Sequence, residues 1–107
     1  MNLQRQMLPL DSIKHAQINA ILEHYGEDKQ RIKACEELSE LQVEVFHNDS
    51  IDCVETSSAY VNLVYEIADV YIMLEQLVKI YNLNKQDIDK AIMLKLRRTE
   101  DRIRAEG

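Results

Sequence analysis

The chain has 107 residues and a mass of 12.5 kDa, enough for one small hydrophobic core and too little for two. Its 13 basic and 19 acidic residues give a formal charge of −6, which argues against binding to a nucleic-acid backbone. Two glycines and one proline are too few for the turns of an all-β fold. We therefore expect a single all-α domain over residues 1–107.

The sequence also bears on the compartment. No uncharged stretch is long enough to cross a bilayer, and residues 1–10 lack the apolar run of a secretory signal. Cys35 and Cys53 do not form a Cys-x-x-Cys pair, and nothing indicates an oxidising environment. We expect a reduced, cytoplasmic protein without a membrane partner.

Two helices are predicted in the first half of the chain. The first runs over residues 13–25, with Asp11 or Ser12 as its cap and Gly26 as its stop. The second runs over residues 28–46, and the polar segment 47–50 ends it. Its apolar residues recur at helical spacing and predict a core-facing seam: Ala34, Leu38, Leu41 and Val45.

Two more helices are predicted in the second half. The third begins between Asp52 and Thr56 and ends near Tyr81, and it is apolar around nearly its whole circumference. Such a helix is buried on more than one side, so we expect a four-helix bundle that is completed by at least a homodimer. Its seam consists of Leu63, Ile67, Val70, Leu74 and Leu77. The fourth helix follows a cap at Asn84 and carries Ile88, Ile92, Leu96 and Ile103.

Acidic pairs on the second and third helices suggest a metal site. Glu66 and Asp69 are the only charges between Tyr60 and Leu74, and an unpaired buried carboxylate is costly. At about 100° per residue, each helix carries its pair at about 60° and about 120° from its seam, in the same rotational sense. In an antiparallel hairpin these offsets bring four carboxylates to one cleft: Glu37, Glu40, Glu66 and Asp69. Oxygen ligands suit Mg²⁺, or Mn²⁺, and an open Mg²⁺ site often serves a phosphate-bearing substrate.

The fourth helix adds basic residues. Lys95, Arg98 and Arg102 are spaced i, i+3, i+7 and form one stripe in an otherwise acidic protein. Lysine and arginine bind phosphate, so this stripe is a candidate for the phosphates of a metal-bound polyphosphate.

Simpler interpretations exist for each feature. Glu37 and Glu40 alone are typical of a solvated helix face, and Glu66 and Asp69 can pair with a basic residue of another helix. The basic stripe alone is typical of a solvent-facing helix end. Glu44 and His47 form a Glu-x-x-His unit of the kind found in di-iron bundles, but the second unit that such a site needs is missing.

The residues EELSE at 36–40 and EIAD at 66–69 resemble the E-E-x-x-E … E-x-x-D signature of the MazG-like all-α nucleoside triphosphate pyrophosphohydrolases. The resemblance covers about residues 27–103. It implies an α-helical bundle, a homodimer or homotetramer, and Mg²⁺-dependent hydrolysis of a nucleoside triphosphate to the monophosphate and pyrophosphate. A role in removing non-canonical nucleotides is also implied, and nucleic acid is not an expected partner.

The resemblance also implies roles for individual residues. Glu37, Glu40, Glu66 and Asp69 would be the metal ligands, with Glu36 nearby, and either Glu36 or Glu40 would orient the attacking water. Lys95, Arg98 and Arg102 would contact phosphates. The chain has no tryptophan, so base recognition does not carry over from members that stack one. The alternative function is a non-catalytic helical module of the same fold that binds a nucleotide or a protein.

Overall fold

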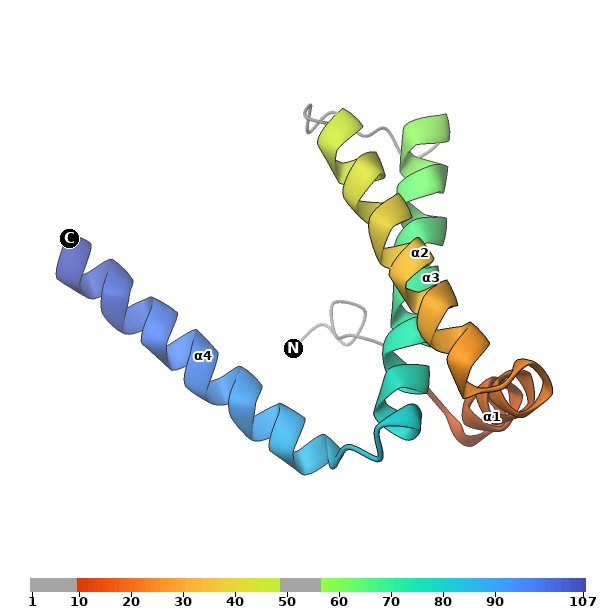
Figure 1. Ribbon diagram of the computed structural model, residues 1–107. Helices are drawn as coiled ribbons and strands as arrows, with labels where there is room; N and C mark the ends of the chain where they lie inside the picture. Colours follow the sequence, from red (N-terminus) through yellow and green to blue (C-terminus); the bar gives the residue numbers. More distant parts are fainter. Residues whose placement is uncertain (1–9, 49–56) are drawn as a thin grey trace. The chain divides into compact units, whose positions relative to one another are not determined.

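A computed structural model describes residues 10–48 and 57–107. Within these ranges the chain contains four α-helices and no strand, which confirms the all-α prediction there (Figure 1). None of the helices in the described ranges has the length and apolarity needed to cross a membrane. The helices are α1 (Ser12–Tyr25), α2 (Glu27–His47), α3 (Ser58–Ile80) and α4 (Lys85–Glu106).

The boundaries of α1 arise from the predicted residues. The backbone N–H of Lys14 donates to Oδ1 of Asp11 at 2.8 Å, so Asp11 is the N-cap. At the other end, the N–H of Gly26 donates to the carbonyl of Leu22 at 2.8 Å. Gly26 has φ 89° and ψ 160°, a conformation that glycine alone adopts easily, and α2 begins at the next residue. Gly26 therefore sets the turn between α1 and α2.

The ends of α3 and the start of α4 are also locally determined. The predicted start of α3 at residues 52–56 lies outside the described residues, which show the helix beginning at Ser58. After Ile80, Asn82 adopts φ 52° and donates to the carbonyl of Lys79 at 3.2 Å, and Leu83 donates to that of Val78 at 2.9 Å. These two bonds form a Schellman motif. Asn84 then caps α4, as predicted, by accepting a 2.8 Å hydrogen bond from the N–H of Gln86.

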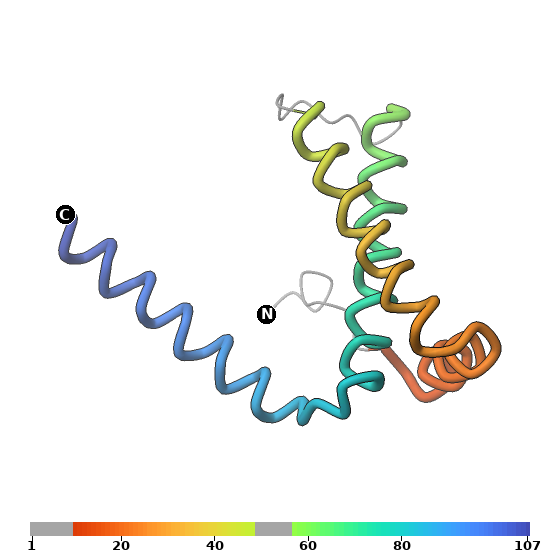
Figure 2. The backbone as a smooth tube through the Cα atoms, in the orientation of Figure 1, coloured from red at the N-terminus to blue at the C-terminus, as the bar shows by residue number. Residues whose placement is uncertain are grey.

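The chain divides into two compact units, residues 1–77 and 78–107. The first unit contains α1, α2 and most of α3, with α2 and α3 side by side and antiparallel (Figure 2). Its buried apolar residues, among those described, are Ile18, Ala34 and Met73. The second unit contains the end of α3 and α4, and no described residue of α4 is buried. The expectation of a single domain stays a prediction.

The contact between α2 and α3 is unusually polar. Gln30, Glu37 and Gln76 are buried, with exposed fractions of 6%, 5% and 0%. Nε2 of Gln30 donates to Oε1 of Gln76 at 2.8 Å. Three pairs of residues face each other across the two helices: Gln30 with Gln76, Glu37 with Asp69, and Glu40 with Glu66. The two residue numbers have the same sum in every pair, as an antiparallel register requires.

Four residues of the predicted seams are exposed instead of buried in the chain's own core. They are Leu38, Val45, Ile67 and Leu74, with exposed fractions of 43%, 57%, 44% and 47%. On α2 they lie about 80–100° from Glu37, and on α3 about 80–100° from Glu66, in the same rotational sense. In an antiparallel pair that places them on one side, which we call the apolar side. The seam prediction is wrong for these residues because α2 and α3 contact each other through the polar residues Gln30, Glu37 and Gln76.

Candidate metal centre

Three carboxylates from two helices form the centre of the candidate site. One oxygen each of Glu37, Glu40 and Glu66 lies within 4.8 Å of the others. We call these three residues the acidic cluster. Glu37 and Glu40 lie about one turn apart on α2, and the antiparallel register brings Glu66 of α3 opposite them. Asp69 lies one turn further along α3, beside Glu37.

The electrostatics of the cluster favour uptake of a positive charge. Burial raises the pKa of the Glu66 carboxyl, and the charges of Glu40, Glu37 and Asp69 raise it further. Burial also raises the pKa of Asp69, and the neighbouring Glu37 carboxylate raises it further. The positive charge of Lys33 lowers it and so opposes the shift. Each carboxyl holds its proton more tightly than usual, because the ionised forms repel one another.

The donor atoms of the cluster fit a hard divalent cation. Oε2 of Glu37 and Oε2 of Glu66 are buried and have no hydrogen-bond partner among the described residues. A buried carboxylate oxygen without a partner costs free energy that a metal ion would recover. An all-oxygen donor set without histidine or cysteine suits Mg²⁺ or Mn²⁺ better than a softer metal. The residues present therefore fit the expected metal, whose identity stays a prediction.

Two hollows lie on the side of the helix pair opposite the apolar side, and the smaller one is lined by two residues of the cluster. The smaller, of about 290 Å³, is lined by Glu40, Glu66 and Glu44, together with Ser39 and Val43. The larger, of about 580 Å³, lies among α1, α2 and α3 and has mostly apolar walls. Its lining comprises Ile21, Tyr25, Lys29, Gln30, Ile32, Lys33, Glu36, Ile72, Met73 and Gln76. The cluster thus opens onto space for a ligand much larger than a metal ion.

The structure brings together most of the predicted acidic residues. Glu37, Glu40 and Glu66 share the cluster, and Asp69 adjoins it through Glu37. Glu36 is exposed and lines the larger hollow. The solvated-face interpretation is wrong for Glu37, which is buried, and is confirmed for Glu40, which is exposed.

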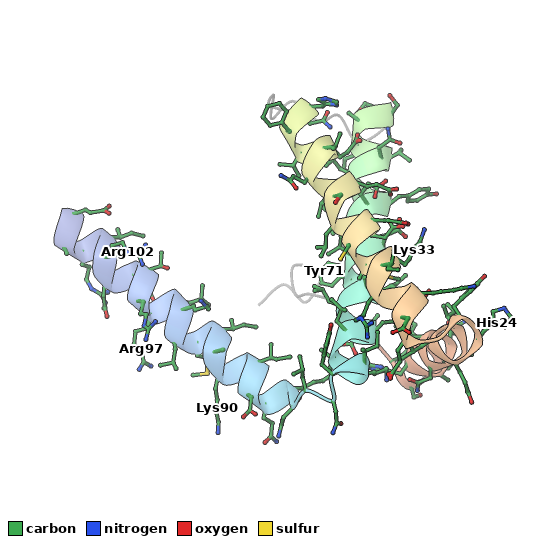
Figure 3. The ribbon with its side chains drawn as sticks, in the orientation of Figure 1. His24, Lys33, Tyr71, Lys90, Arg97 and Arg102 are labelled. Carbon is green, nitrogen blue, oxygen red and sulfur yellow. The ribbon has the colours of Figure 1, made fainter. Side chains whose placement is uncertain are left out.

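The predicted basic residues lie elsewhere in the chain. Lys95, Arg98 and Arg102 are exposed on α4, which belongs to the second unit. Arg102 is labelled on this helix in Figure 3. Their role in phosphate binding stays a prediction.

Sequence reasoning missed two residues of this region. Nζ of Lys33 lies 3.0 Å from Oε1 of Glu37, and Glu44 lines the smaller hollow. The i, i+4 spacing of Lys33 and Glu37 is an ordinary helical ion-pair signal and could have identified Lys33. The sequence singles out Glu44 only through the Glu-x-x-His unit with His47, and its place at the smaller hollow depends on how the helix is rotated.

The raised pKa values predict how stability depends on pH. The folded chain holds protons on Glu66 and Asp69 at pH values above their ordinary pKa values of 4.5 and 3.8, where the unfolded chain has lost them. Without metal, the stability that these carboxyls contribute is therefore present at low pH and is lost as pH rises through the raised values. In EDTA, we expect Tm to be higher below these ordinary pKa values and to fall as pH rises through the raised ones.

The Glu66→Gln variant is the control, because it removes one of these protons and leaves the histidines in place. Thermal melts followed by circular dichroism should show a flatter pH dependence for this variant than for the wild type. Mg²⁺ should raise the wild-type Tm more at the higher pH, where protons compete less for the carboxylates. An equal pH slope in both proteins would contradict the prediction.

The comparisons with known proteins complete the description of the site. No protein-family model, no curated protein and no solved structure matches the chain significantly.

Proposed function

We propose that the chain is a Mg²⁺-dependent nucleoside triphosphate pyrophosphohydrolase that converts a (deoxy)nucleoside triphosphate to the monophosphate and pyrophosphate, with non-canonical nucleotides as possible substrates. The observation that carries the proposal is the acidic cluster, whose three donor oxygens lie within 4.8 Å and whose buried oxygens on Glu37 and Glu66 lack partners. The resemblance of residues 36–40 and 66–69 to the MazG-like signature supports the same reaction. The proposal includes a cytoplasmic homodimer or homotetramer.

The acidic residues have separable tasks in this reaction. Glu37, Glu40, Glu66 and Asp69 hold the metal, which when bound supplies Lewis acidity and a water of lowered pKa. Glu36 lies outside the acidic cluster and is exposed in the larger hollow. Of the two candidates for orienting the attacking water, we therefore favour Glu36, because Glu40 is committed to the metal.

The larger hollow is the proposed place for the nucleoside. Its walls are mostly apolar, and Tyr25 offers an aromatic ring beside the paired amides of Gln30 and Gln76. Apolar walls with a few polar groups are typical of small-molecule sites. Lys33, which lines this hollow and pairs with Glu37, connects the hollow to the acidic cluster.

The test is a panel of canonical and modified nucleoside triphosphates, incubated with the full chain and Mg²⁺ and assayed for pyrophosphate. We expect release with at least one member, and its loss in EDTA. A parallel titration with Mn²⁺, followed by electron paramagnetic resonance, reports metal binding without turnover. Silence across the panel with metal bound would overturn the enzymatic proposal and favour the non-catalytic binding module. Failure to bind the metal would overturn the metal centre itself.

A further inference from the structure

Lys33 is in direct contact with the acidic cluster. Its Nζ lies 3.0 Å from Oε1 of Glu37, and the Glu37 side chain is 7% exposed. The hydrogen bond to Glu37 and the charge of that carboxylate raise the pKa of Lys33, with smaller effects of Glu36 and Glu40. The ammonium is therefore held as a cation at an oxygen of a proposed metal ligand.

Lys33 also reaches the larger hollow. Its side chain, labelled in Figure 3, is 49% exposed. Lys33 lines that space together with Lys29, one turn earlier on α2. The acidic Glu36 is the other charged residue in the lining. Lys33 thus stands at the boundary between the buried carboxylates and the space proposed for the nucleotide.

A divalent cation and the Lys33 ammonium compete for the same carboxylate. The two cations repel each other, so occupancy of Glu37 by a metal favours movement of Lys33 away from it. The flexible four-carbon stem of lysine allows that movement, and the half-exposed position leaves room for it. The space into which the ammonium can move is the larger hollow, which Lys33 already lines.

We propose that Lys33 is the counter-ion of Glu37 in the metal-free protein and a ligand of the polyphosphate once a divalent cation is bound. This inference rests on the proposed function, since it takes the phosphates to be brought to the cluster with the metal. Lysine binds phosphate as a point charge with three donors, and Lys29 adds a second positive charge on the same face. Lys33 is then a substrate-binding residue that sequence reasoning did not identify.

The test is the Lys33→Met variant, which keeps most of the apolar stem and removes the charge. We measure Mn²⁺ binding by electron paramagnetic resonance, first alone and then with inorganic triphosphate. Mn²⁺ alone should bind about threefold to tenfold more tightly than to the wild type, because a competing cation is gone. Inorganic triphosphate should bind the Mn²⁺-loaded variant about tenfold more weakly.

Two further variants make the experiment decisive. Lys14→Met removes a comparable lysine, which pairs with Asp11 at 3.1 Å on α1, and should change neither constant. Lys33→Arg keeps the charge, so its binding constants for Mn²⁺ and triphosphate should lie close to those of the wild type. This variant can be compared with the wild type even if Lys33→Met does not fold. Opposite shifts of the two constants in Lys33→Met support the inference. Unchanged or weaker Mn²⁺ binding, or unchanged triphosphate binding, would overturn it, whereas absence of Mn²⁺ binding to the wild type would overturn the metal centre.

Discussion

Replacing Asp69 by asparagine is expected to lower Mg²⁺-dependent release of pyrophosphate about a hundredfold or more. The substitution keeps the shape of the side chain and removes one negative charge beside Glu37. In the metal-free protein the same change should raise Tm, because the repulsion that raises the pKa of Asp69 disappears. A gain in stability together with a loss of function is typical of a site where like charges are gathered for a ligand.

The control for this variant is Asp28→Asn. Asp28 is 89% exposed at the start of α2 and pairs with Arg31, so its loss should leave turnover unchanged. Initial rates with the best substrate of the panel and melting curves in EDTA measure the two effects. Full turnover in Asp69→Asn would show that Asp69 is not a metal ligand. A fall in the metal-free Tm would show that its charge is not repelled by the cluster.

Replacing Leu74 by lysine is expected to dissociate the protein. The four residues of the apolar side are exposed on two neighbouring helices: Leu38, Val45, Ile67 and Leu74. A contiguous apolar surface of this kind is typical of a subunit interface. We expect the wild type to be at least a dimer at micromolar concentration. A lysine on the apolar side should weaken association about a hundredfold or more, since burying an unpaired ammonium costs several kcal/mol.

Ile13→Lys provides the matched control. Ile13 is 70% exposed on α1, about 140° from the buried Ile18, and is not part of the apolar side. Its substitution should leave the mass unchanged. Light scattering after size-exclusion chromatography measures the mass of each variant over a range of concentrations. A wild-type chain that is monomeric at micromolar concentration would contradict the dimer and would imply that another part of the same chain covers the apolar side.

The helices themselves could be predicted because their ends are set by local chemistry. Asp11 and Asn84 cap with their own side chains, and Gly26 supplies a conformation that other residues avoid. The acidic residues that meet in the cluster could also be predicted. The angles of the acidic residues around each helix axis follow from their residue numbers alone. The antiparallel hairpin then brings the pairs of both helices to the same side.

The rotation of α2 and α3 about their own axes could not be predicted. The sequence places Leu38 about 100° from Glu37 but does not say which of the two faces α3. The apolar seam was expected to face inward because burial of apolar surface usually decides the matter. In the chain, the Gln30–Gln76 hydrogen bond and the facing carboxylates occupy that contact, and the apolar residues remain exposed. The apolar circumference of the third helix predicts a partner subunit, but the sequence does not say which face of the helix that partner covers.

Because the register of α2 and α3 is fixed, the site is sensitive to insertions within either helix. One residue inserted between Lys33 and Glu40, or between Glu66 and Gln76, would turn everything beyond it by about 100° and shift it by about 1.5 Å. The carboxylates and the amide pair could then not face their partners at the same time. Residues added between His47 and Ser58 leave the spacing within α2 and within α3 unchanged. Natural variation in chain length should therefore fall in that connection, and the spacing within each helix should remain constant.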